Sequence, residues 1–63
     1  PAGVSDSAKQ QSQQAYLAGM VYFQQGNYEK ARDQFMLAKQ LDPGNPDAAA
    51  GLDRIEKLYG GGQ

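Results

Sequence analysis

Few side chains in this sequence could perform chemistry. It contains no histidine and no cysteine, so the commonest general base and the strongest nucleophile are both absent. Glu29 and Asp33 are spaced so that they could share one face of a helix as paired carboxylates. Lys30 and Arg32 stand beside them, however, and this mixture of charges is typical of a solvated helix face. We therefore expect no catalytic site and interpret the chain as non-enzymatic.

The composition also argues against cofactors and against several classes of partner. Without cysteine and histidine the chain lacks a disulfide framework and the ligands of the usual zinc site. The glycines at 60–62 have no helix after them, as a phosphate-binding loop would require. Six basic residues against seven acidic ones give no electrostatic reason for a nucleic-acid partner, and no run approaches the ~20 apolar residues of a membrane-spanning helix. We expect no cofactor, no nucleic acid and no membrane insertion, and therefore a protein or peptide partner.

The chain has 63 residues, which allows one small domain. A domain of this size buries only roughly 60% of the surface that its unfolded chain exposes, so its stability should be marginal. Because the chain starts with Pro1 rather than Met, we interpret it as a processed product or a piece of a longer protein. A partner or the longer parent chain is the expected source of additional stability.

Three helices joined by short turns are predicted. The first should cover 8–25, after a flexible lead-in at 1–7 in which Ser5, Asp6 or Ser7 can cap it. The second should start at Tyr28 or Glu29, with Asn27 as its cap, and should end at the Asp42-Pro43-Gly44 segment. The third should cover 46–59, with Asn45 as its cap and Pro46 in the first helical position, before a flexible glycine-rich tail at 60–63.

The first predicted helix is apolar on two sides. Gly19 interrupts it, and an isolated glycine in a helix usually indicates that another element packs closely there. One side consists of Ala15, Ala18, Val21 and Tyr22, and the other is the apolar stripe of Tyr16, Met20 and Phe23. The apolar face of the third helix should consist of Ala48, Leu52, Ile55 and either Leu58 or Tyr59.

The joint spacing of small and aromatic residues resembles the tetratricopeptide repeat, a 34-residue helix-turn-helix unit. The resemblance is carried by Gly19, Tyr22, Gly26, Tyr28, Ala31, Phe35, Ala38 and Pro43. It implies an all-α fold, in which an antiparallel hairpin at 12–45 and a capping helix at 46–59 form one domain at 8–59. Ala15 and Ala18 stand where the family prefers tryptophan and leucine, which thins the packing of the first helix. Asp53 stands where a repeat of this family has a small residue, which favours a terminal helix over a further repeat. A generic three-helix bundle with coincidental spacing is the alternative.

The resemblance also implies where a partner would bind. Arrays of this family hold a peptide or a partner helix on the concave face, and the matching residues are Gln13, Tyr16, Met20, Phe23 and Gln24. The apolar stripe suits an apolar or amphipathic segment. Tyr16 and Met20 occupy the places of the family's carboxylate clamp, so chaperone C-terminal tails are not expected.

Two alternatives to this site remain open. The apolar stripe could instead pack on the third helix or on the N-terminal lead-in, in which case it is structural. A second hypothesis is self-association of the parent protein through the same stripe or through Met36 and Leu37.

Overall fold

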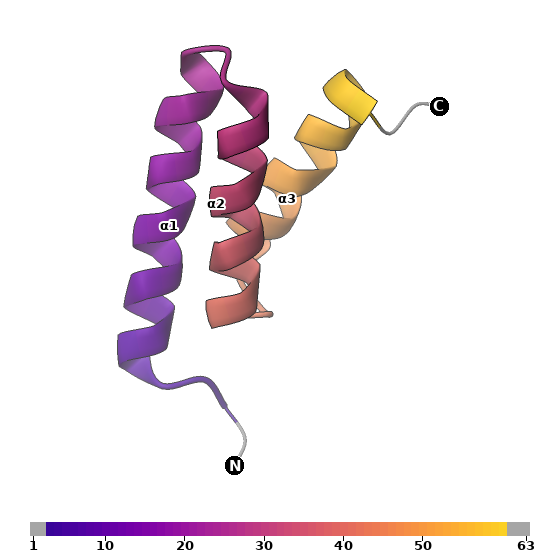
Figure 1. Cartoon of the computed structure of the whole chain (residues 1–63). Coiled ribbons are helices and arrows are strands. Elements are labelled where there is room, and N and C mark those ends of the chain that lie inside the picture. The colour runs from indigo at the N-terminus through magenta and orange to yellow at the C-terminus, as the bar shows by residue number, and fades with distance from the viewer. Residues whose placement is uncertain (1–2, 61–63) are drawn as a thin grey trace.

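The computed structural model describes residues 3–60, which form a helical hairpin followed by a third helix (Figure 1). The helices are α1 (Asp6–Gln24), α2 (Tyr28–Leu41) and α3 (Pro46–Ile55), and a π-helical turn, η1 (Glu56–Gly60), continues α3. No strand occurs among the described residues. The predicted all-α fold, an antiparallel hairpin with an additional helix, is confirmed.

The first helix starts earlier than predicted. The Ser5 hydroxyl accepts a hydrogen bond from the backbone N–H of Ala8 at 3.0 Å, so Ser5 is the N-cap. The helix therefore begins at Asp6, two residues before the predicted start, and the predicted lead-in at 1–7 is partly helical. Asp6 then lies in the first turn, where a carboxylate complements the helix dipole.

A Schellman motif ends α1 and reverses the chain. Gly26 has a φ of +80°, a left-handed conformation that glycine adopts without steric cost. The N–H of Gly26 donates to the carbonyl of Phe23 at 3.0 Å, and the N–H of Asn27 donates to that of Tyr22 at 2.9 Å. The Asn27 side chain accepts from the N–H of Lys30 at 3.4 Å, which confirms Asn27 as the cap of α2.

The third helix starts as the sequence predicts. The Asn45 side-chain oxygen accepts from the N–H groups of Asp47 and Ala48 at 2.9 and 3.3 Å, and Pro46 occupies the first helical position. Proline suits this position because its fixed φ is helical and its missing N–H would have no partner there. From this cap α3 runs alongside α2, and its far end leans away from the hairpin (Figure 1).

The core is built around the ring of Phe35, which lies between two glycines. A Cβ at Gly19 of α1 would lie 2.6 Å from Cδ1 and Cε1 of Phe35, and one at Gly51 of α3 would lie 3.0 Å from the other side of the ring. The predicted close approach at Gly19 is confirmed, whereas the sequence did not single out Gly51. The buried apolar side chains are Ala15, Ala31, Phe35, Ala38, Ala48 and Ile55.

Two residues from the predicted apolar faces are exposed. Val21 is 54% exposed, because the buried face of α1 is formed by Ser12, Ala15 and Gly19 and therefore turns Val21 toward solvent. Leu58 is 61% exposed, because η1 continues α3 beyond the region that packs on α2 (Figure 1). The Tyr59 side chain and the predicted tail residues 61–63 lie outside the described part of the structure.

The remaining signature residues support the hairpin or follow it. The Tyr22 ring is half-buried, and the Lys30 ammonium lies 5.8 Å from its centroid in a cation–π arrangement across the turn. Tyr28 is half-buried beside the core. Pro43 follows the end of α2 and is exposed.

Candidate functional site

The apolar stripe lies along the side of α1 that borders α3. Tyr16, Met20 and Phe23 are all half-buried, and all three pack against the cluster formed by Ala31, Phe35 and Ile55. Ile55 belongs to α3, so the stripe packs against a cluster to which α2 and α3 both contribute. Each of these side chains is therefore partly buried in the core and partly exposed.

Two ring contacts hold the ends of the stripe. The centroid of the Tyr16 ring lies 5.6 Å from that of Phe35, with a tilt of 31°. The Phe23 ring lies 5.2 Å from that of Tyr28, with a tilt of 55°. Contacts of this geometry contribute about 0.5–1.5 kcal/mol each beyond the area they bury. Packing therefore holds both rings in place.

The two predicted glutamines are exposed at opposite ends of the stripe. Gln13 ties α1 to the start of α3: its side-chain oxygen accepts from Asn45 at 3.3 Å, and its amide nitrogen lies 3.5 Å from a carboxylate oxygen of Asp47. Gln24 is the last residue of α1, and its side chain makes no hydrogen bond within residues 3–60. All five predicted residues thus lie on α1. The Gln13 end of this surface is hydrogen-bonded to the start of α3, and the Gln24 side chain makes no such bond within residues 3–60.

A buried polar link between the three helices was not predicted. The Ser12 hydroxyl donates to the carbonyl of Ala38 at 2.6 Å and accepts from the Asn45 amide at 2.9 Å. Ser12 is fully buried and Asn45 is 6% exposed. Ser12 lies three residues before Ala15 and seven before Gly19, which places it on the core face of α1. This spacing was the signal in the sequence that could have predicted its burial. The hydrogen bonds satisfy the hydroxyl, so it has a structural role.

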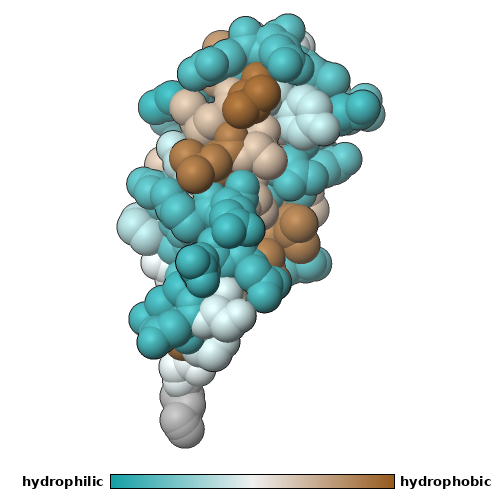
Figure 2. Space-filling model, turned by 90° about the vertical axis from the view of Figure 1, so that its left-hand side faces the viewer, coloured by the Kyte–Doolittle hydropathy of each residue, from teal (hydrophilic) through white to brown (hydrophobic). Residues whose placement is uncertain are grey.

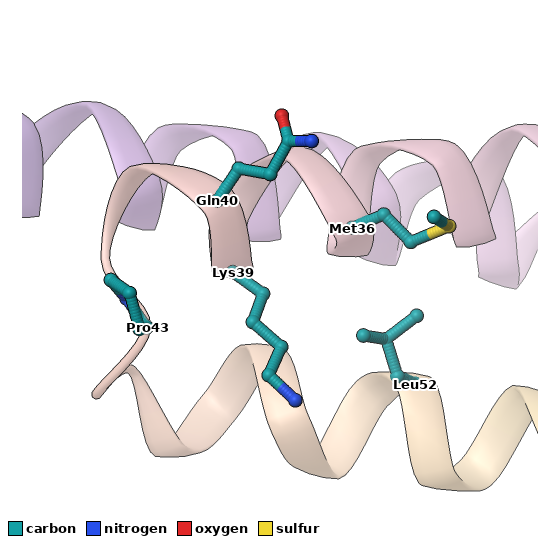
Figure 3. A pocket seen from close by; sticks show the side chains of 5 residues that line it. All are labelled: Met36, Lys39, Gln40, Pro43 and Leu52. Atoms are coloured by element: carbon teal, nitrogen blue, oxygen red, sulfur yellow. The ribbon is translucent and has the colours of Figure 1, made fainter.

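A shallow groove of about 340 Å³ lies on the other side of α2, between α2 and α3. Met36 and Leu52 point toward one another across it, and Lys39 extends from α2 toward α3 (Figure 3). Gln40 and Pro43 complete its lining. None of the five predicted partner-binding residues lies in this groove, although it contains Met36, which was considered for self-association.

Other classes of site find no support in the described part of the chain. Residues 3–60 contain no group of three or more carboxylate, histidine or cysteine residues that could hold a metal ion. No helix among these residues is both long and apolar enough to cross a membrane. Their one ion pair joins Lys57 to Asp53 at 3.1 Å, as the i,i+4 spacing predicts, and both side chains are largely exposed. A pair in that environment contributes little to stability.

Comparison with known families decides between a repeat unit and a generic bundle. A family model described as tetratricopeptide repeat matches residues 13–45, more than half of the 63 residues. The chain belongs to the tetratricopeptide repeat family. The search of curated proteins and the search of solved structures gave no match.

The tetratricopeptide repeat assignment confirms the resemblance seen in the sequence. The α1–α2 hairpin provides the helix-turn-helix of the repeat, and α3 is the additional helix that packs on it. Tetratricopeptide repeats are non-catalytic units that mediate protein–protein interaction. The functional question is therefore which surface of this repeat contacts a protein.

Proposed function

We propose that the chain is a protein-interaction module that binds an apolar or amphipathic segment of its partner along the apolar stripe. The observation that carries this proposal is the half-buried state of Tyr16, Met20 and Phe23, which are fixed by core contacts yet keep part of their surface exposed. Gln13 and Gln24 form the two ends of the binding surface.

The arrangement suits a segment with apolar side chains. The two rings are already ordered, so binding requires little loss of side-chain entropy. Met20 lies between them along α1, and the flexible thioether can adapt to side chains of different shape. The amides of Gln13 and Gln24 can donate to and accept from a peptide backbone. Residues 10–24 carry no charge, so the affinity should depend little on salt.

A selected peptide provides the first test. A displayed library of 15-residue peptides is screened against the chain, and the best binder is synthesised and titrated by fluorescence anisotropy. We expect Met20→Glu to weaken binding at least about tenfold, which corresponds to roughly 1.4 kcal/mol, because it places a charge in the centre of an apolar contact. Gln24→Arg should also weaken binding, since Gln24 borders the same surface and is exposed.

Controls separate loss of the surface from loss of the fold. Met36→Glu changes an exposed methionine on α2, outside the stripe, and should bind the peptide as the unchanged chain does. Circular dichroism verifies that each variant stays helical; Gln24→Arg is informative even if Met20→Glu unfolds. The assignment of the stripe is wrong if folded Met20→Glu and Gln24→Arg both keep the original affinity.

A further inference from the structure

The face of α1 opposite the core is apolar at its centre, and no described element covers it. Leu17 is 53% exposed and Val21 is 54% exposed. Their i,i+4 spacing places both side chains on one face of the helix. Figure 2, which views the molecule from the α1 side, shows apolar side chains framed by hydrophilic ones. This surface is separate from the apolar stripe, whose residues turn toward α3.

The residues around this centre follow the spacing of paired helices. The outer face of α1, as we define it, consists of Gln10, Gln14, Leu17, Val21 and Gln24, and every one of these residues is exposed. Successive members are separated by four, three, four and three residues. Alternating steps of three and four keep side chains on the line where two helices meet along their length.

The absence of charge on this face favours a second copy as the occupant. Residues 10–24 contain no charged side chain, whereas the exposed positions of α2 include Glu29, Lys30, Arg32 and Asp33. In a two-fold symmetric contact each surface meets its own copy, so charges near the axis would face like charges. The outer face of α1 avoids this repulsion and presents amide groups that can both donate and accept hydrogen bonds.

We propose that two copies of the chain associate through the outer face of α1, with the two helices antiparallel. In this register Leu17 packs against the partner's Val21, and Gln14 meets the partner's Gln24. The antiparallel arrangement also opposes the two helix dipoles favourably. Tyr16, Met20 and Phe23 lie outside the contact, and Gln24 is the one residue that borders both surfaces.

The dimer should be reversible. Because the contact involves only two apolar side chains from each copy, we expect it to bury less than the roughly 1,200 Å² of stable interfaces and to be half-dissociated at about 0.1–1 mM. Sedimentation equilibrium over a concentration series that brackets this range measures the association directly. A monomer at every concentration would overturn the proposal.

Substitutions locate the contact. Leu17→Glu should abolish association, because it places a charge at the centre of the outer face. Met36→Glu is the matched control, since Met36 is 45% exposed on α2 and the variant should dimerise unchanged. Both positions are exposed, so both variants should remain helical by circular dichroism. Dimerisation of Leu17→Glu at the original strength would show that another face is used.

A mixing experiment tests the orientation. Leu17→Glu and Val21→Lys should each be monomeric alone, because each would place a charge against an apolar side chain of the partner copy. Mixed in equal amounts they should form a heterodimer, since the antiparallel register brings the glutamate of one chain to the lysine of the other. Failure of the mixture to associate, while the unchanged chain dimerises, would contradict the antiparallel register.

Discussion

At the scale of single residues, the contact between Phe35 and two glycines determines how closely the three helices approach. The ring is 1% exposed, and it fills the space that a Cβ would occupy at both Gly19 and Gly51. Because the ring is enclosed from the sides of α1 and α3, it cannot rotate away from an added methyl group. The size of residue 19 therefore sets the distance between α1 and α2.

We expect Gly19→Ala to destabilise the fold by about 1–3 kcal/mol, because the added Cβ would lie 2.6 Å from the Phe35 ring. The better helix propensity of alanine, about 1 kcal/mol, offsets only part of this cost. Urea unfolding followed by circular dichroism measures the change. Gly44→Ala is the control, since its Cβ would make only an ordinary 3.5 Å contact with Asp42. Equal midpoints for the two variants would contradict the role given to Gly19.

At the scale of elements, the turn between α1 and α2 depends on one backbone conformation. Among residues 3–60, Gly26 is the glycine with positive φ, and no other residue type in that range has one. The Schellman bonds to the carbonyls of Phe23 and Tyr22 require this conformation. The reversal of the chain, and with it the packing of α1 on α2, therefore depends on a residue that makes no core contact.

Gly26→Ala should cost about 1–2 kcal/mol, the strain of an L-residue in the left-handed region. Gly26→Asn should cost less, because asparagine adopts this conformation more readily than alanine does. The free energy of unfolding in urea distinguishes the two variants. Gly3→Ala serves as the control, since its added Cβ would meet nothing within 4 Å. If alanine and asparagine at position 26 were equally stable, strain at this glycine would not limit the turn.

At the scale of the whole molecule, the hairpin and α3 share one small core. Phe35 and Ile55 belong to the same buried cluster, and the Ser12–Asn45 hydrogen bond joins α1 to the start of α3. A chain of this length should have a total stability of about 3–9 kcal/mol. Losing one large buried side chain would therefore remove a substantial part of the stability of the entire unit.

Ile55→Ala should destabilise the chain by about 2–5 kcal/mol, because the side chain is fully buried and its removal leaves a cavity. The helical signal at α1, α2 and α3 should be lost in a single transition, since the three helices share one core. Leu58→Ala, at a position 61% exposed, should leave the midpoint nearly unchanged. Residue-resolved hydrogen exchange would contradict this view if Ile55→Ala released α3 alone and left the hairpin protected.

The sequence by itself determined the helices, their caps and the turn. Asn27, Asn45 and Pro46 were predicted in the roles they hold, and Gly26, which has the positive φ, was among the residues that carry the family resemblance. These features are local, because a cap or a turn is completed by backbone groups within a few residues. The family spacing can likewise be read from the sequence, because it depends on which side chains meet across the hairpin.

Only the tertiary structure decided which apolar residues are covered. Val21 and Leu58 were placed on predicted apolar faces and are exposed, whereas Ser12 and Gly51 were not singled out and are buried. Periodicity gives the faces of a helix but not the rotation that turns one face inward; the approach of Gly19 and Gly51 to Phe35 fixes that rotation. The apolar stripe followed from spacing, but its half-buried state depends on packing against the cluster formed by α2 and α3. Local backbone chemistry thus specified the elements, and packing between them decided which surfaces remain for partners.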